Sequence, residues 1–385
     1  MAHAVIIGGG TAGLPTAYEL AELARPGERI TVVADRAGFR SGASTPWITA
    51  QDGTEFDLAQ NLRRRGIGFS AAGARRLHPE RNRLELGDGS LLDYDYLVIA
   101  AGPRAAFDTI EGLGPDGYTH SLCHADHLHG CVRDWNRLLA NPGPVVVGAA
   151  QGATCFAPAY ESALFMEHEL RARKLRERVP MTFVTPEPYI GHLGVGGIAD
   201  SRARLEAALR ERDIEWIADA RVERVERGTM YVTAGGTGKP RALPFKYAML
   251  MPPFRGIEAV ADIEGLADAR GFILIDECLR NPKYPNVYAA GVTVASAAAG
   301  AAAESHKSAY LIESMVNAVV RNIRDAIDGK PPRAGAEWNA VHLADLGASG
   351  LAFIADPSPS LQPAHGVAAG DWVQLSRCSA CDVAG

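Results

Sequence analysis

The chain has 385 residues, of which 47% are hydrophobic and 22% charged, so it is long enough for about two or three domains with their own cores. A net charge of -6 and a pI of about 6.0 argue against nucleic acid as a main partner. The 6 cysteines do not form a disulfide-scaffold pattern, and no signal peptide or bilayer-length apolar run is evident, so we expect a cytoplasmic protein.

The first segment predicts a dinucleotide-binding unit. Residues 4–7 predict a buried strand, residues 14–23 an Ala/Leu-rich helix and residues 30–33 a second strand. The turn before the helix fits G-x-G-x-x-G, with Gly8, Gly10, Thr11, Ala12 and Gly13. Such glycines let a pyrophosphate approach the helix N-terminus, and Asp35, about 20 residues further on, can accept hydrogen bonds from ribose hydroxyls.

Two later segments repeat a strand that ends in small residues. Residues 94–103 form one such strand and its turn, with Ala101 and Gly102, and residues 287–291 form the other, which ends at Gly291. A helix over residues 305–328 follows. We interpret these segments as a discontinuous FAD-binding domain, residues 1–105 and 262–330, whose last helix points its N-terminus at the flavin. Two unrelated Rossmann-like strands remain the alternative.

The middle of the chain predicts a second Rossmann-like domain over residues 106–261. A strand at 143–148, a helix at 159–175 and a strand at 181–184 form its first βαβ unit. The turn at 148–155 does not fit G-x-G-x-x-G, and the second strand ends at Thr185-Pro186 without an acidic residue. This domain is therefore a poor site for NAD. Residues 331–385 are left as a short C-terminal region.

Two cysteines in the second domain are candidates for redox chemistry. Cys155 precedes the helix of the βαβ unit, and a helix N-terminus can lower the pKa of a thiol and favour the thiolate. Cys123 lies close to His127, which could move protons near neutral pH. For each cysteine the alternative is a small buried apolar residue.

Three further residues have a chemical and a structural interpretation. Glu161 is a proton acceptor or only a carboxylate in the first turns of a helix, and His192 is a proton relay or a structural hydrogen-bonding group. Lys307 is a cation beside the flavin or an exposed lysine. Residues 120–131 contain four histidines and two cysteines, but without a second ligand cluster we predict no metal site. The C-x-x-C at 378–381 is treated as incidental.

At these motifs the sequence resembles the sulfide:quinone oxidoreductases, a family of flavoproteins with two dinucleotide-binding domains. The resemblance is carried by residues 121–127, 143–161, 187–194 and 310–314, and it extends from residue 1 to about 357. It implies an α/β fold with two Rossmann-like domains. It also implies FAD-dependent oxidation of sulfide to polysulfide or sulfur, with a membrane quinone as the electron acceptor.

The resemblance also implies roles for individual residues. Cys123 and Cys155 match two redox-active cysteines that carry sulfur near the flavin. His127, Glu161 and His192 match groups suggested for acid–base or relay work, and Lys307 matches a lysine near flavin and quinone.

The sequence departs from the family in three places. His342 stands where the family has a third redox cysteine, so polysulfide growth is in doubt. Residues 295–303 replace a proline-rich stretch, which alters the expected quinone pocket. Beyond residues 370–373 the amphipathic helices that dock the family on membranes are not found, so docking stays open between a cytoplasmic and a peripheral membrane protein.

Two other functions remain as alternatives: an NAD(P)H:acceptor flavin reductase, and a catalytically degraded flavin-binding protein. A homo-oligomer is left open.

Overall fold

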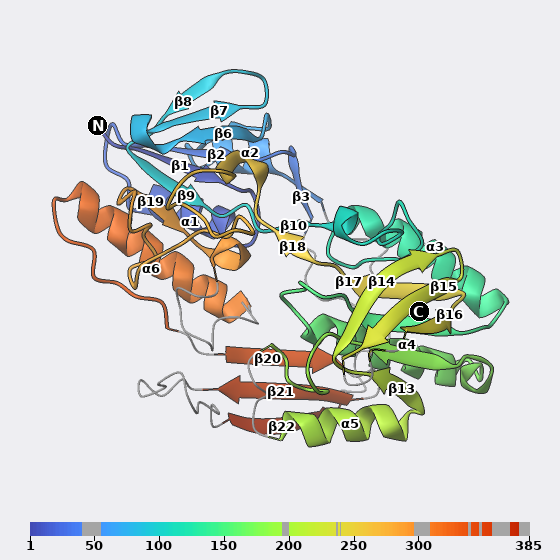
Figure 1. Cartoon of the computed structure of the whole chain (residues 1–385). Coiled ribbons are helices and arrows are strands. Elements are labelled where there is room, and N and C mark those ends of the chain that lie inside the picture. The colour runs from blue at the N-terminus through green and yellow to red at the C-terminus, as the bar shows by residue number, and fades with distance from the viewer. Residues whose placement is uncertain are drawn as a thin grey trace. The chain divides into compact units, whose positions relative to one another are not determined.

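The computed structural model describes residues 1–40, 55–194, 200–235, 238, 240–295, 309–337, 340–345, 349–355 and 370–376. The chain divides into two compact units, whose elements are labelled in Figure 1. The first unit comprises Met1–Ser41, Gly53–Arg104 and Arg255–Asn339, and the second comprises Gly42–Asp52, Ala105–Phe254 and Ala340–Gly385.

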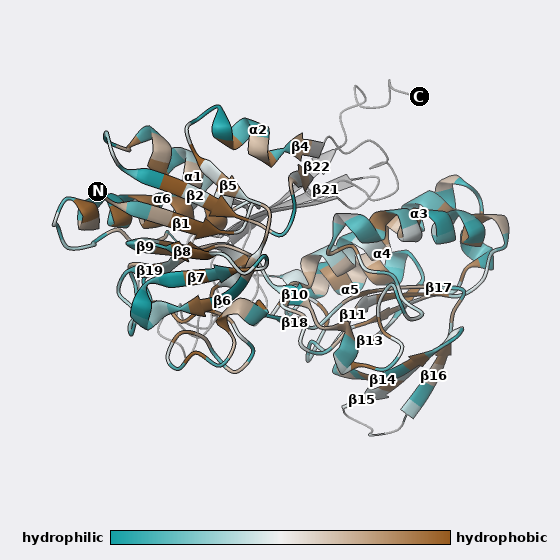
Figure 2. Ribbon diagram, turned by 90° about the horizontal axis from the view of Figure 1, so that it is seen from above, coloured by the Kyte–Doolittle hydropathy of each residue, from teal (hydrophilic) through white to brown (hydrophobic). Residues whose placement is uncertain are grey.

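The first unit is built on a five-stranded parallel sheet. Its order is β19 (Val287–Ala289), β9 (Tyr96–Ile99), β1 (His3–Ile7), β2 (Arg29–Val33) and β5 (Gly68–Ser70). Every residue of β1 is buried, as a strand covered on both faces requires, and Figure 2 shows β1 and β2 as predominantly hydrophobic. Ile7 pairs with both Val33 and Ile99, so the carboxyl ends of β1, β2 and β9 meet at one edge. The turns that follow these strands therefore gather there.

Helices α1 (Gly13–Glu22) and α6 (Ala309–Ile327) of this unit pack against each other. The predicted helix at 14–23 and strand at 30–33 are confirmed, whereas residues 305–308 of the predicted last helix lie outside the described part of the chain. Smaller elements complete the unit: β3 (Gly38–Arg40) pairs with β4 (Glu55–Asp57) before α2 (Leu58–Arg63), and β6 (Ala74–His78), β7 (Arg83–Leu86) and β8 (Leu91–Asp93) form an antiparallel sheet.

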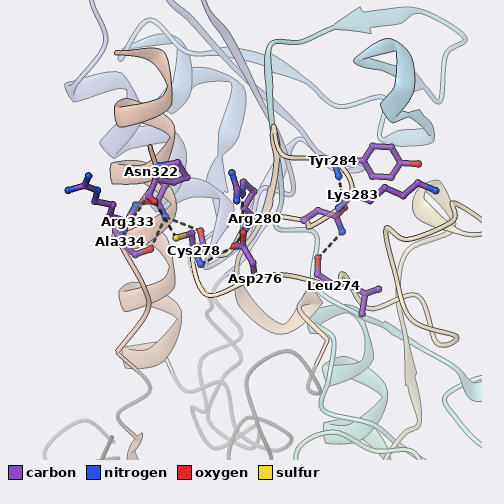
Figure 3. Close-up of polar contacts among 11 residues, drawn as sticks. Leu274, Asp276, Cys278, Arg280, Lys283, Tyr284, Asn322, Arg333 and Ala334 are labelled. Atoms are coloured by element: carbon purple, nitrogen blue, oxygen red, sulfur yellow. Dashed lines mark hydrogen bonds and ion pairs between the residues drawn. The ribbon is translucent and has the colours of Figure 1, made fainter. Parts of the chain in front are cut away.

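Asn322 on α6 fixes this helix to two neighbouring segments (Figure 3). Its fully buried side chain donates to the carbonyl oxygens of Cys278 at 2.9 Å and Ala334 at 2.7 Å. The amides of Arg333 and Ala334 donate back to its Oδ1 at 3.0 and 2.9 Å. One side chain thus satisfies four backbone groups, which orders the chain on both sides of the helix.

The second unit contains a four-stranded parallel sheet whose two faces are buried by different layers. The order is β13 (Ile214–Ile217), β12 (Met181–Val184), β11 (Val145–Ala149) and β17 (Tyr247–Met251). In β11, Val145 and Val147 belong to the same core as residues of α3 (Ala125–Ala140), α4 (Ala157–Ala172) and α5 (Ser201–Glu211). Val146 belongs to another core, shared with the antiparallel sheet of β14 (Ala220–Glu226), β15 (Thr229–Ala234) and β16 (Pro240–Pro244). This alternation is the period of two expected of a strand.

The strand predicted at 181–184 is confirmed. The helix predicted at 159–175 is found at Ala157–Ala172, so it begins two and ends three residues earlier than predicted. Residues after 339 contribute an antiparallel sheet to this unit, β20 (Ala340–Asp345), β21 (Ser349–Ala355) and β22 (Gly370–Ser376), in which β20 packs on α4. No strands were predicted there.

The remaining elements are short. Strands β10 (Arg104–Ala105) and β18 (Phe254–Arg255) pair with each other. The single-turn 3₁₀ helices are η2 (Pro79–Arg81), η3 (Phe107–Thr109), η4 (Arg176–Arg178), η5 (Glu258–Val260) and η6 (Gly291–Thr293).

Candidate functional site

The turn between β1 and α1 has the backbone of a dinucleotide site. Gly8 has a φ of 121°, and a Cβ there would collide with the carbonyl of Ala100. A Cβ on Gly13 would collide with the carbonyl oxygen of Gly8, whereas a Cβ on Gly10 would meet nothing within 4 Å. The outer two glycines are therefore needed for packing, and the middle one leaves space for a ligand at the backbone.

The surroundings of this turn fit an anionic, ribose-containing ligand. Helix α1 has no acidic residue in its first turn, and its N-cap, Ala12, makes no side-chain cap, so the positive end of the helix dipole favours a phosphate there. Asp35 follows β2 with 58% of its side chain exposed, beside Arg104 Nη2 at 3.4 Å. Arg104 was not predicted, although it directly follows the predicted 94–103 segment.

The two other small-residue turns have a left-handed backbone at their glycines. Gly102, after Ala101, has a φ of 67°, and Gly291, at the start of η6, has a φ of 83°. A Cβ on Gly291 would lie 3.0 Å from the Cβ of Ala12. The structure thus brings the β19 turn to the start of α1, as the interpretation of a single nucleotide site requires. Lys307 lies outside the described residues.

The second unit brings Cys123, Cys155 and Glu161 together. Cys155 lies in the turn between β11 and α4, Cys123 lies shortly before α3, and both residues are half-buried free thiols. Burial, and to a smaller extent the neighbouring Cys123 and Glu161, raise the pKa of Cys155 to about 12. Burial likewise raises the pKa of Cys123 to about 12. The shift at Cys155 is opposite to the lowering expected at a helix N-terminus, because burial outweighs the backbone hydrogen bond of Ala157, which acts to lower the pKa of Cys155.

The two predicted histidines of this unit are held by aromatic contacts. His127 lies on α3, with its ring centroid 5.6 Å from that of Phe107 and 5.5 Å from that of His124. His192 follows β12 and meets the ring of Tyr189 edge-on at 5.2 Å. The electrostatic neighbours of Cys155 include Cys123 and Glu161, so the structure groups these three side chains.

A buried carboxyl that the sequence did not single out lies next to the His192 loop. Glu187 is 2% exposed and accepts hydrogen bonds from Tyr160 and Thr185, each at 2.7 Å. Burial raises its pKa, while these donors act in the opposite direction. Its position after a strand carries no sign of burial, because acidic residues after strands are usually exposed.

The strand β20 carries His342, whose backbone lies opposite Phe353 of β21. The C-x-x-C at 378–381 lies outside the described residues. Within the described residues, no three His, Cys, Asp or Glu side chains are grouped so that they could hold a metal ion. Nor is any helix there both long and apolar enough to span a bilayer.

Comparison with known proteins identifies the family. The model of the pyridine nucleotide-disulphide oxidoreductase family matches residues 2–319. A sulfide-quinone reductase of Aquifex aeolicus is 36% identical over 365 residues, which cover 92% of this chain and 84% of the relative. The mitochondrial sulfide:quinone oxidoreductase of Schizosaccharomyces pombe is 26% identical over 227 residues, 56% of this chain and 48% of the relative.

The solved structures agree with the sequence comparison. The X-ray structure of the sulfide:quinone oxidoreductase from Aquifex aeolicus superposes with a TM-score of 0.88 at 34% identity, covering 97% of this chain and 87% of that one. The predicted α/β flavoprotein fold is thereby confirmed. The chain belongs to the pyridine nucleotide-disulphide oxidoreductase family, among its sulfide:quinone oxidoreductases.

Proposed function

We propose that this protein is an FAD-dependent enzyme that oxidises sulfide to polysulfide or sulfur and delivers the electrons to a quinone. The observation that carries the proposal is the 36% identity with a sulfide-quinone reductase over 92% of the chain. The pair of half-buried thiols beside Glu161 supports it, because sulfide oxidation needs a sulfur carrier.

We assign the flavin to the first unit. The open space at Gly10, the uncapped start of α1 and the exposed carboxylate of Asp35 suit the pyrophosphate and ribose of FAD. When bound, the flavin supplies the acceptor for two electrons. We further propose that residues 1–105 and 262–330 are the flavin domain, that 106–261 are the thiol domain, and that Lys307 lies near the flavin.

In the thiol domain we propose Cys155 as the sulfur carrier and Cys123 as its partner. With a pKa of about 12, the Cys155 thiol is protonated at neutral pH, so it becomes a nucleophile only when a base takes its proton. Glu161, which is its electrostatic neighbour, is the proposed acceptor of that proton. His127 and His192 are the proposed relay groups between this pair and solvent.

His342 cannot hold a sulfur bridge, so the proposed pathway uses only Cys155 and Cys123 as carriers. A quinone dissolved in lipid must be reached from the membrane surface. We therefore propose peripheral attachment to the membrane.

The alternative of an NAD(P)H-dependent reductase is disfavoured by the second unit. The side chain of Gln151 in the β11–α4 turn is bound to the backbone of Val222, donating at 2.9 Å and accepting at 3.0 Å. Thr185, where an NAD site would have its acidic residue, is fully buried and bonded to Glu187. Neither group is free to bind a nicotinamide dinucleotide.

The test is anaerobic reduction of the purified flavoprotein, which is monitored through the absorbance of the visible flavin band. We expect sulfide to bleach the band, NADH to leave it unchanged, and a soluble quinone to restore it. Cys155→Ser should slow bleaching by sulfide about a thousandfold or more. Cys131→Ser is the matched control: Cys131 is a free cysteine of the same unit, but it is fully buried and lies outside the proposed pathway.

Each other outcome contradicts the proposal in a different way. Bleaching by NADH alone would assign the protein to the reductases. No bleaching by either reductant would indicate a flavin-binding protein that has lost its activity. An equal loss in Cys155→Ser and Cys131→Ser would remove Cys155 from its proposed role.

A further inference from the structure

The loop that carries His192 has an unusual backbone on both sides of that residue. Gly191 has a φ of 80° and Leu193 a φ of 55°, so both lie in the left-handed region. Glycine adopts this region without cost, but leucine does so only under strain. A strained backbone persists where surrounding contacts over-determine it, which happens most often at functional sites.

Glu187 supplies those contacts. The amide of Leu193 donates to its Oε1 at 2.5 Å, and the hydroxyl of Tyr160 donates to its Oε2 at 2.7 Å. The amide of Gly191 donates to the Tyr160 hydroxyl oxygen at 3.0 Å. Both amides that flank His192 therefore end at one buried carboxyl, directly or through Tyr160.

The hydrogen-bond network is also linked to the thiol pair, because one of its members is adjacent in sequence to the neighbour of Cys155. Tyr160 lies on α4 immediately before Glu161, the electrostatic neighbour of Cys155. The ring of Tyr160 stacks on Phe183 of β12 at 4.5 Å, which fixes its direction in the core. Burial and the adjacent Glu187 hold the pKa of Tyr160 well above 10.0, so the hydroxyl keeps its proton and remains a donor at neutral pH.

We propose that Glu187 and Tyr160 are positioning residues for His192, which hold the loop backbone on both sides of its imidazole and tie it to the helix that bears Glu161. The inference rests on the proposed function, because it takes His192 as a relay group in sulfide oxidation. Neither residue is assigned contact with sulfide or flavin.

The decisive variant is Tyr160→Phe, which removes the hydroxyl and keeps the stacked ring. Tyr231→Phe is its matched control, since the Tyr231 hydroxyl donates to Glu226 at 3.1 Å on an exposed part of the same unit. We expect Tyr160→Phe to slow sulfide-dependent flavin reduction at least tenfold and to speed hydrogen exchange at the amides of Gly191 and Leu193. Tyr231→Phe should change neither.

The same substitution in a protein that lacks the His192 imidazole distinguishes a positioning role from a general effect on protein stability. In a His192→Asn protein, Tyr160→Phe should cause no further loss of rate, because the group it positions is already absent. Glu187→Gln, which keeps one acceptor oxygen for the Leu193 amide, should retain more activity than Glu187→Ala.

The outcomes are distinguishable. An equal loss from Tyr160→Phe in both backgrounds, or no loss in either, overturns the inference while sulfide oxidation by the unaltered protein stands. A protein that sulfide does not reduce overturns the proposed function itself.

Discussion

Burial sets the acidity of the two candidate redox thiols. With a pKa of about 12, Cys155 has only a small thiolate fraction at neutral pH, and that fraction rises tenfold with each pH unit until the pKa is reached. We therefore predict that alkylation of Cys155 by iodoacetamide accelerates about tenfold per unit between roughly pH 7 and 10. Mass spectrometry of the labelled peptide would follow the rate. A plateau in the alkylation rate below pH 9 would contradict the prediction, because it would mean that the pKa of Cys155 is lower than about 9.

The glycines of the β1–α1 turn should separate folding from flavin binding. Gly10→Val places a side chain in open space, so we expect a folded protein that has lost its flavin. Gly13→Val drives a side chain into the carbonyl of Gly8 and should prevent folding. The ratio of flavin to protein absorbance, with circular dichroism, measures both effects. Gly130→Val, also in open space but on α3, should retain both flavin and fold.

The sequence predicted which residues form the nucleotide-binding turn better than it predicted the burial and pKa values of the side chains. Spacing alone located Gly8, Gly10 and Gly13, because steric rules act on neighbours in the chain. It could not give the pKa of Cys155 or the burial of Glu187, which depend on side chains from other elements. Arg104 was missed because its partner, Asp35, is distant in the sequence.

At the scale of elements, the packing of α6 against its neighbouring segments depends on the buried side-chain amide of Asn322. Asn322→Ala would leave the backbone groups of Cys278 and Ala334 without partners, and we predict a loss of about 3 kcal/mol in the free energy of unfolding. Asn317→Ala on the exposed side of the same helix should change it by less than about 0.5 kcal/mol. Urea unfolding of both variants measures the difference; equal effects would contradict the prediction.

The elements nearest the glycine turns were predicted closely, since a hydrophobic run that ends in glycine marks a buried parallel strand. Strand β1, which is followed by Gly8, was predicted at 4–7 and occurs at His3–Ile7. Strands β20, β21 and β22 were missed. Pairing between β21 and β22 joins residues across a long connection, whereas a hairpin is signalled in a sequence by a two-residue turn between adjacent strands.

At the scale of the whole molecule, an ion-pair cluster joins distant parts of the chain. Arg324 bonds Glu28 at 2.7 Å and Asp328 at 2.8 Å, and Arg25 bonds Asp328 at 2.8 Å. Hydrogen bonding from Arg324 lowers the pKa of Glu28 below 4.5. The stabilisation is therefore present above pH 4.5 and is lost as the pH falls through the lowered pKa.

We predict that Arg324→Met reduces the free energy of unfolding at neutral pH and flattens its decline between about pH 5 and 3. Urea titrations at several pH values measure this. Arg83→Met, which breaks an exposed pair with Asp93, should leave the neutral-pH value nearly unchanged. A decline as steep in Arg324→Met as in the unaltered protein would assign the acid sensitivity to other carboxyls.

The alternation along β11 restricts where residues can be inserted into or deleted from this chain. Its successive residues enter two different cores, so one inserted residue would move Val145 and Val147 out of the core of the helices and Val146 into it. The same holds for β17, where Met249 and Leu250 belong to opposite cores. Alignments with relatives should therefore contain no gaps within these strands, and insertions or deletions should fall in the connections between them.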